Sequence, residues 1–519
     1  MIQNLNKILL SPFTINLSFF SSLFFFASIV DMIAWICYGD PIFAFYFGLH
    51  GFVMCYVITL IAYFLKNVKG GAAYKIIFLG LGVVNAAIDI FCHYTLRMGF
   101  TYDMVGIIKA TNPQEISEFA DMFFDWRPLL ILVSLCCFTY IVYWLLTKIK
   151  IPKLVPYLGI LLVLVGIGAT TLKHSSNWGR VFLGKPYLYF SYELPPDLKQ
   201  YYTDFEIKVD KGRLPRNVVI VVGESFSKDH SSLYGYEKKT NPYLEELLRD
   251  SLLFVYDSVS APATHTIPSF QNIMSMYNEG EQKNWYECTT IIEVFDKVGY
   301  RTSWVSNQSQ KGGYDNVVAK YAELCDTSLW AGNRFEGANR TTFDEEVLPL
   351  IASLINDTTN LNFYCVHLMG SHYTFDTRYP LEQWTKFIET DYSQFMHHQR
   401  YNQATYDNSI LYNDYVVREI IRFFEEDDTM LLYLSDHALD VYNSSTDYVG
   451  HATGNPKSKE AALRIPYMMY MSHTCQTLHP ESKKIVEQEL SESLNSTNMI
   501  FSLMRILGIE ISVVLDSNN

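Results

Sequence analysis

Long apolar runs are concentrated in the first third of the chain. They lie near 14–37, 43–65, 73–95, 127–147 and 154–172. Each run holds about twenty residues, which is the length that a helix needs to cross roughly 30 Å of hydrocarbon. The pattern therefore predicts five membrane-spanning helices. The first run has no small-residue cleavage site and further spans follow at once, so we expect it to stay attached.

Lysine positions between these runs predict the orientation, because cytoplasmic loops near span ends are enriched in Lys and Arg. Lys7 precedes the first span, Lys66 and Lys69 follow the second, and 148–153 follows the fourth. The loop near 97–126 falls on the other side and is acidic. Five spans with the N-terminus inside place the rest of the chain outside. We expect a multi-pass membrane protein; in a bacterium this would be the inner membrane, with the larger part of the chain in the periplasm.

Two acidic residues, Asp31 and Asp89, lie within the predicted spans. A charge inside a membrane is costly and usually faces the interior of the helix bundle or the interface. We interpret both residues as packing or helix-end residues rather than as substrate ligands.

The pattern changes after residue 175. Segment 176–212 mixes Tyr and Phe with Pro and Lys, a composition suited to the lipid headgroup region, and we interpret it as a bridge lying on the membrane. From 213 to 519, strand-like runs alternate with amphipathic helical stretches, which argues for an α/β domain with a mainly parallel sheet. The predicted strands are 217–222, 302–305, 362–368, 430–434 and 467–471.

Polar side chains directly follow four of these strands, where α/β sheets of this kind bind their ligands. Glu224 follows the first strand, Asn307 the second, His372 the third, and Asp436 with His437 the fourth. Glu224, Asp436 and His437 together offer two carboxylates and an imidazole, a mixed oxygen and nitrogen set that suits zinc or manganese. The alternative for Glu224 is that it caps the N-terminus of a helix.

A metal site that catalyses group transfer also needs a nucleophile, such as a hydroxyl that the metal can activate. Ser225 begins a GxS turn, but the final Gly of GxSxG is absent, so we reject it as a hydrolase nucleophile. Thr264 and Thr266 begin a predicted helix, whose free N–H groups and positive dipole end favour a phosphate. The alternative is that one Thr is only the N-cap. His372 and His451 lie in loops, where they either hold a further metal or a phosphate or face solvent.

Composition narrows the choice of partners. The chain has 519 residues, of which 49% are hydrophobic and 18% charged, so it is neither disordered nor an ordinary soluble domain. The 54 acidic and 40 basic residues give a formal charge of −14 without a basic block, which argues against nucleic acid as a partner. No two of the 9 Cys form a CxxC pair, so a zinc ribbon or a thioredoxin-like site is not expected.

The order of these motifs resembles that of the bacterial phosphoethanolamine transferases, which decorate lipid A or core sugars and include enzymes of polymyxin resistance. Segments 217–225 and 232–236 look like the metal-binding opening motif of this family. The resemblance covers essentially the whole chain. It implies a transmembrane domain with five helices over 1–175, the interfacial bridge over 176–212, and a periplasmic domain over 213–519 with the alkaline-phosphatase/sulfatase fold.

The resemblance also implies roles for individual residues. Thr266 fits the family nucleophile because Ser269 and Ser275 stand three and nine residues after it, whereas Thr264 does not fit. One or two zinc ions are implied, held by Glu224, Thr266, Asp436 and His437. The implied contacts to the phosphoethanolamine group are Asn307, Lys311, His372 and His451, and those to the lipid headgroup are Asn112 and Glu115.

Two features depart from the family pattern. The family usually reads SDHGE, whereas here Ala438 and Leu439 follow His437, so the acidic residue is missing and we expect Asp440 to replace it. Well-known relatives carry several disulfides in the outer domain. In this chain the pairing to test is Cys288 with Cys325, and we expect the mid-strand Cys365 to be a buried free thiol.

The resulting hypothesis is a zinc-dependent transferase. It takes phosphoethanolamine from phosphatidylethanolamine through a covalent intermediate on Thr266 and passes it to lipid A or another envelope glycolipid. The alternatives are a glycerol-phosphate transferase of the lipoteichoic-acid-synthase type, a sulfatase-like phosphodiesterase, and a non-catalytic glycolipid receptor. Asn307 and Lys311 favour ethanolamine, and no aldehyde-forming sulfatase cassette appears near Thr266.

Overall fold

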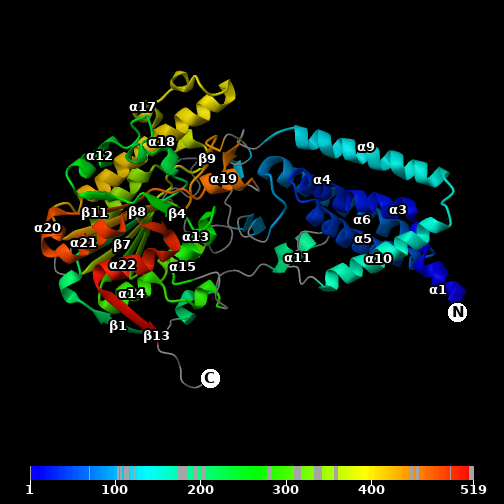
Figure 1. Ribbon diagram of the computed structural model, residues 1–519, viewed down its shortest axis with the longest axis horizontal. Helices are drawn as coiled ribbons and strands as arrows, with labels where there is room; N and C mark the ends of the chain where they lie inside the picture. The colour runs from blue at the N-terminus through cyan, green and yellow to red at the C-terminus, as the bar shows by residue number, and fades with distance from the viewer. Residues whose placement is uncertain are drawn as a thin grey trace. The chain divides into compact units, whose positions relative to one another are not determined.

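The computed structural model divides into two compact units, which we describe separately (Figure 1). The first comprises Met1–Ile108 and Phe123–Glu193, and the second Lys109–Met122 and Leu194–Asn519. The structure describes residues 2–513 except for 69, 102–103, 106–107, 110–115, 118–119, 121–123, 173–183, 192–195, 202–204, 278–282, 309–316, 332–341, 356–359, 445–447, 452–454 and 491.

The first unit is built from apolar helices. Among the described residues, four helices are long and apolar enough to cross a membrane: Leu17–Cys37, Pro41–Phe64 (α5), Gly71–Leu96 and Arg127–Lys148 (α9). They coincide with the first four predicted spans. The fifth prediction falls on a shorter apolar stretch, Leu154–Ala169, within α10 (Leu154–Leu172), so a count of five spans stays a prediction.

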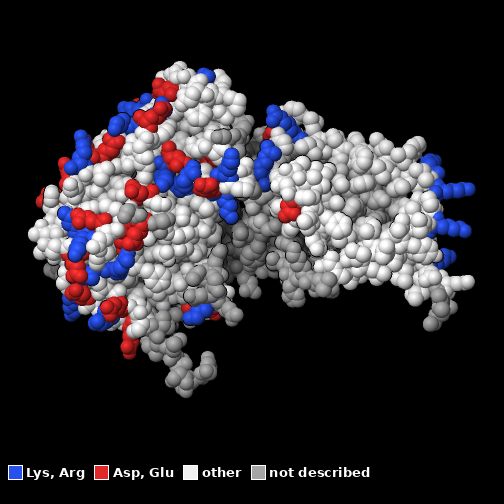
Figure 2. Space-filling view, in the orientation of Figure 1, with Lys and Arg blue, Asp and Glu red and all other residues white. Residues whose placement is uncertain are grey.

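Several helices of this unit are composed of shorter segments. The first long helix joins α3, a π-helical turn and α4, and the third joins α6 to another π-helical turn. The joined segments are α3 (Leu17–Phe24), α4 (Val30–Cys37) and α6 (Gly71–Phe91). Three shorter helices are separate from them: α1 (Ile2–Leu9), α2 (Ser11–Thr14) and α11 (Gly184–Ser191). In Figure 2, this unit is largely free of charged side chains, and Lys and Arg gather at one end.

The two acidic residues of the spans are buried and paired inside the first unit. Asp31 lies 2.6 Å from His93 Nε2, and Asp89 forms an ion pair with Lys185 of α11. The Lys185 ammonium also donates to the side-chain oxygen of Asn85 at 2.9 Å. The interpretation of Asp31 and Asp89 as packing residues agrees with this geometry. The network also ties α11, which lies inside the predicted bridge, to the apolar helices.

A seven-stranded sheet organises the second unit, with strand order β3-β11-β8-β2-β7-β5-β6. Neighbouring strands are parallel except that β11 is antiparallel to both of its neighbours. All the predicted strands are present, and the prediction of a mainly parallel sheet is confirmed. The strands are β2 (Asn217–Gly223), β3 (Leu253–Val255), β5 (Arg301–Ser306), β6 (Thr327–Trp330), β7 (Asn362–His367), β8 (Thr429–Ser435) and β11 (Tyr467–Met471).

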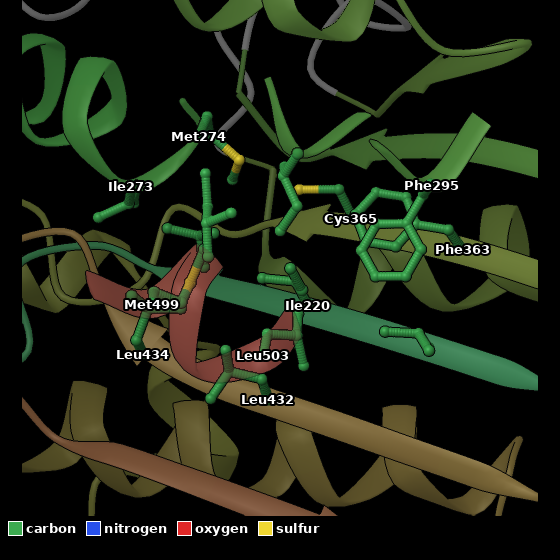
Figure 3. Close-up of a cluster of buried hydrophobic side chains, with 14 of the residues drawn as sticks. Ile220, Ile273, Met274, Phe295, Phe363, Cys365, Leu432, Leu434, Met499 and Leu503 are labelled. Atoms are coloured by element: carbon green, nitrogen blue, oxygen red, sulfur yellow. The ribbon is translucent and has the colours of Figure 1, made fainter. Parts of the chain in front are cut away.

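Helices cover both faces of this sheet, with α14 and α22 on one side and α12 and α18 on the other (Figure 1). Figure 3 shows Met499 and Leu503 of α22 beside Ile220 of β2 and Leu432 of β8. β2 is buried along its whole length because it is central and covered on both faces. On the α18 face, the Tyr433 hydroxyl donates to the side-chain oxygen of Asn413 at 2.8 Å.

Smaller elements complete the second unit. β1 (Phe205–Val209) pairs with β13 (Ile509–Val513), β4 (Ser258–Ser260) with β12 (Ser493–Asn495), and β9 (Asp440–Val441) with β10 (Val449–Gly450). The helices are α12 (Pro242–Arg249), α13 (Thr266–Ile273), α14 (Ile291–Val298), α15 (Val317–Ala322), α16 (Leu348–Leu354), α17 (Leu381–Trp384), α18 (His397–Arg422), α19 (Pro456–Ala461), α20 (His473–Leu478), α21 (Pro480–Glu489) and α22 (Met499–Leu507).

The cysteine predictions have a mixed outcome. Cys288 and Cys325 are both free thiols in the structure, so the expected pairing between them is wrong. Cys365 lies in β7, is fully buried and is free, as predicted. The core around the sheet is large and closely packed, and the fold is complete without a disulfide among the described residues.

The register of the central strands sets the position of the site. Val222 lies opposite both His367 and Leu434, and His367 also lies opposite Ser306. The carboxyl ends of β8, β2, β7 and β5 therefore meet at one edge, and the residues that follow them lie close together.

Candidate metal and nucleophile site

Glu224, Asp436 and His437 form a compact buried cluster where β2 and β8 end. One donor atom from each lies within 4.8 Å of the others. His437 Nε2 is 3.1 Å from Glu224 Oε1 and 3.5 Å from Asp436 Oδ2. The structure thus brings together the three residues that sequence reasoning selected as metal ligands.

The backbone around Glu224 is held in an unusual conformation. Ser225 has a positive φ of 62°, which is rare and costly outside glycine. Its N–H donates to Asp436 Oδ1 at 3.2 Å, and its hydroxyl donates to Glu224 Oε1 at 2.8 Å. Ser225 therefore orients the two carboxylates. The N-cap alternative for Glu224 is wrong, because the helical turn that follows begins at Lys228 and is capped by Ser227.

Hydrogen bonding fixes the tautomer of His437. Its Nδ1 lies 3.1 Å from the carbonyl oxygen of Ala438, which can only accept, so Nδ1 carries the proton. The other ring nitrogen, Nε2, faces Glu224 and Asp436. A histidine held by a backbone carbonyl in this way is typical of metal ligands.

Positive charge between the carboxylates of Glu224 and Asp436 would stabilise this buried cluster. Burial, followed by the neighbouring Glu224, raises the pKa of Asp436 to about 8. Burial opposes the charged form of His437, but the two carboxylates outweigh it and raise the pKa of His437 to about 9. Asp436 Oδ2 is buried without a hydrogen-bond partner among the described residues. This orphaned oxygen, the fixed Nε2 and the mixed donor set fit a divalent cation such as zinc.

Thr266 is the first residue of α13, and its hydroxyl reaches the cluster. Oγ1 lies 3.2 Å from Glu224 Oε2 and 3.5 Å from His437 Nε2. The N-cap residue of α13 is His265, so the alternative in which one Thr is the cap is wrong. Thr264 instead hydrogen-bonds to His265 Nδ1 at 3.0 Å. The geometry therefore agrees with the choice of Thr266 over Thr264.

Histidines surround this cluster. The ring of His451 lies 4.4 Å from that of His437 and 4.7 Å from that of His265, measured between centroids. Burial, followed by the charge of His437, lowers the pKa of His265 to about 3 and that of His451 well below its usual value. Burial opposes the charged form of Glu224, but the charge and hydrogen bond of His437, followed by the charge of His372, outweigh burial and lower the pKa of Glu224. The solvent-facing alternative is therefore wrong for His451 and His372, which are only partly exposed.

The remaining predicted contacts are placed only in part. Asn307 directly follows β5, is 2% exposed, and its N–H donates to His367 O at 3.0 Å. It therefore lies at the same sheet edge as Glu224. Lys311, Asn112 and Glu115 lie outside the described residues.

Asp440 does not replace the missing acidic residue of the family motif. One of its oxygens accepts from the N–H groups of Asn443 at 2.8 Å and Ser444 at 3.1 Å, and the other accepts from the Ser444 hydroxyl. Both oxygens are committed to this turn. The expectation that Asp440 contacts an amine is therefore not supported.

Sequence reasoning missed two residues of this region. His265 precedes the candidate nucleophile, and a histidine beside Thr266 was the signal that could have found it. Asp344 is buried and accepts hydrogen bonds from Asn307, Met369 and Gly370. Burial raises its pKa, although these hydrogen bonds act in the opposite direction. No sequence signal marks Asp344, because its partners lie far away along the chain.

Comparison with known proteins identifies the family. The chain is 24% identical to phosphoethanolamine transferase EptC of Escherichia coli (strain K12) over 475 residues, covering 84% of this chain and 80% of that protein. The structure of integral membrane protein lipooligosaccharide phosphoethanolamine transferase A from Neisseria meningitidis aligns over 97% of this chain and 95% of its own, with a TM-score of 0.62 and 18% identity. The C-terminal periplasmic domain of EcEptC from Escherichia coli in complex with Zn aligns over 63% of this chain and 92% of its own, with a TM-score of 0.53 and 24% identity. The family model named Sulfatase matches residues 216–509, more than half of the sequence, and the chain therefore belongs to the sulfatase family.

Proposed function

We propose that this chain is a zinc-dependent phosphoethanolamine transferase of the bacterial inner membrane, with its second unit in the periplasm. The single observation that carries the proposal is the position of the Thr266 hydroxyl, 3.2 Å from Glu224 at the start of α13 and beside Asp436 and His437. The names of the relatives and the apolar helices of the first unit support the lipid-linked part of the proposal.

Glu224, Asp436, His437 and Thr266 would hold the zinc. A bound zinc ion supplies positive charge that lowers the pKa of a neighbouring hydroxyl and stabilises charge on phosphate oxygens. The Zn complex of the EcEptC domain supports this assignment. His372 and His451 offer further nitrogen ligands beside the cluster, so the site would hold one or two ions.

The residues of the chain account for the first half of the reaction. Glu224 Oε2 accepts the hydrogen bond of Thr266 and so holds the hydroxyl proton away from the attacking lone pair. Thr266 Oγ1 forms a bond to phosphorus while the phosphorus–oxygen bond to diacylglycerol breaks, and the proton of the hydroxyl ends on the released diacylglycerol. Because Thr266 begins α13, the positive end of the helix dipole lies beside the phosphate.

The second half restores the nucleophile. A hydroxyl or a protonated phosphate of an envelope glycolipid, such as lipid A, attacks the phosphorus of the Thr266 ester, the Oγ1–phosphorus bond breaks, and Oγ1 takes up the proton that the attacking group releases. Asn307, Lys311, His372 and His451 are proposed to hold the transferred group, and Asn112 with Glu115 the lipid headgroup. The donor would be phosphatidylethanolamine and the acceptor a glycolipid, both reaching the site from the membrane.

The test is the mass of the peptide that contains Thr264 and Thr266, taken from protein purified out of its own membrane. We expect an adduct of about 123 Da, the formula mass of the phosphoethanolamine group on a covalent nucleophile. The adduct should disappear in Thr266→Ala and persist in Thr264→Ala. An adduct of about 154 Da would indicate glycerol phosphate instead. Absence of any adduct would overturn the proposal, and absence of bound zinc as well would favour a non-catalytic receptor.

A further inference from the structure

A single buried carboxylate connects Asn307 to the loop that contacts Glu224. Asp344, which is 3% exposed, accepts from Asn307 Nδ2 at 2.9 Å and from the N–H of Met369 at 2.7 Å through one oxygen. Its other oxygen accepts from the N–H of Gly370 at 2.8 Å. Asp344 therefore holds together two segments that follow β5 and β7 at the edge of the sheet.

Hydrogen bonds also determine the orientation of the Asn307 side-chain amide, that is, which positions its nitrogen and its oxygen occupy. Its Nδ2 points at two acceptors, Asp344 Oδ1 at 2.9 Å and the carbonyl oxygen of Thr342 at 3.3 Å. Turning the amide over would place Oδ1 against both of these oxygens and lose two hydrogen bonds. The amide of Asn307 is thus locked with its oxygen directed away from Asp344.

Asn307 Oδ1 is buried and makes no hydrogen bond within the described part of the chain. Buried acceptors are usually paired, so this atom is available to a donor that the described residues do not supply. A phosphate diester offers no donor, whereas the ammonium of ethanolamine offers three N–H groups.

The backbone of Asn307 lies at the edge of the sheet where Glu224 lies. Its N–H donates to the carbonyl of His367, whose strand pairs with the strand that carries Glu224. Gly370, held by Asp344, packs so closely on Glu224 that an added Cβ would lie 2.6 Å from its carbonyl oxygen. The hydrogen bonds of Asp344 therefore join Asn307 to the backbone of a candidate metal ligand.

We infer that Asp344 is a positioning residue that locks Asn307 with its amide oxygen toward the substrate, so that the site selects a donor headgroup bearing N–H groups. The inference rests on the proposed function. In this inference the neutral amide oxygen of Asn307 recognises the amine of the headgroup by accepting a hydrogen bond from it, in addition to any attraction to its charge. Asp344 itself does not touch the substrate and acts through Asn307.

Comparing two donor lipids distinguishes the effect of hydrogen bonding by the headgroup amine from the effect of its positive charge. Phosphatidylethanolamine has three N–H groups, whereas phosphatidylcholine keeps the positive charge but has none. Full-length protein is incubated with vesicles of either lipid, and the peptide carrying Thr266 is weighed for adducts of about 123 or about 165 Da, the formula masses of the two transferred groups. The measured quantity is the ratio of the initial rates of adduct formation.

The expected result is a strong preference for phosphatidylethanolamine in the native protein. Asp344→Asn introduces a donor that lets the Asn307 amide turn over, and Asn307→Ala removes the acceptor. Both variants should lower the preference by about tenfold or more, as the loss of a hydrogen bond to a charged group predicts. The adduct from phosphatidylcholine should change little.

Asp414 provides a matched control for the change of charge and for folding. It is fully buried and accepts from two backbone N–H groups and from an asparagine amide, but it does so at α12. Asp414→Asn should leave the donor ratio as in the native protein. An unchanged ratio in Asp344→Asn, or an equal fall in both rates, would refute the positioning role. Absence of any adduct in the native protein would instead refute the proposed function itself.

Discussion

Gly370 is the position where the smallest substitution should disturb the candidate metal site most. It has a positive φ of 53° and packs on the backbone of Glu224. A Cβ built on Gly370 lies 2.6 Å from the Glu224 carbonyl oxygen and 2.7 Å from its nitrogen, closer than real Cβ contacts come. Because both are backbone atoms, neither can rotate away. We therefore predict that Gly370→Ala displaces Glu224.

The expected magnitude has two parts. Placing alanine in the left-handed region costs about 1–2 kcal/mol. Relieving the overlap with Glu224 adds about 1–3 kcal/mol, as for overpacked cores. The sum is about 2–5 kcal/mol of unfolding free energy. Displacement of a ligand should also weaken zinc binding by about 10–100-fold, the range found when groups that orient metal ligands are lost.

A substitution at Gly299 distinguishes the cost of backbone strain from the cost of overlap with Glu224. It ends α14 with a φ of 100°, and an added Cβ would meet nothing within 4 Å. Gly299→Ala therefore incurs the backbone strain without touching the site. The assay is thermal unfolding of both variants in detergent, together with zinc titration against a competing chelator. Equal loss of stability in the two variants, with unchanged zinc affinity in Gly370→Ala, would refute the reasoning.

Two further predictions concern buried ion pairs away from the site. Lys185→Met should destabilise the first unit by about 3 kcal/mol or more, because Asp89 then loses its cationic partner; unfolding of Lys185→Met with and without Asp89→Asn checks this, and the double variant should recover part of the loss. His479, which pairs with Asp428 at 3.0 Å, has a pKa raised above 6.5 because the hydrogen bonds to Asp428 and Gly212 outweigh burial. Its contribution to stability is therefore complete below pH 6.5 and is lost as the pH rises through the raised pKa. Chemical unfolding across that range should show this loss in the native protein and not in His479→Gln.

Sequence alone was sufficient for the centre of the second unit. The run from Val218 to Val222 is continuously apolar because its strand is buried on both faces, and this makes the strand and its end unambiguous. Once the ends of β2 and β8 are located, Glu224, Asp436 and His437 follow, since neighbouring parallel strands end at the same edge. The cluster of these three residues was predictable because strand order and strand length determine it.

Residues whose role depends on distant partners were not predictable. Asp344 receives its hydrogen bonds from residues near 307 and 369, and only the folded chain brings these together. The expectation for Asp440 failed for a related reason, since proximity to His437 in sequence says nothing about which groups the carboxylate will contact. The predicted disulfide between Cys288 and Cys325 was wrong because the positions of cysteines along the chain do not give the distance between them in the fold.

The missing acidic residue of the family motif bears directly on how an amine is recognised. Leu439 stands where the motif has Glu, and it is fully buried in the structure. A carboxylate at that position would need a buried cation or donor, and Leu avoids this cost. The nearest substitute, Asp440, is committed to its own turn. With neither Leu439 nor Asp440 directing a carboxylate at the substrate, the unpaired oxygen of Asn307 is a neutral acceptor that the described part of the site presents in addition to the carboxyl oxygen Asp436 Oδ2 of the candidate metal cluster. A neutral acceptor discriminates by the number of N–H groups rather than by charge.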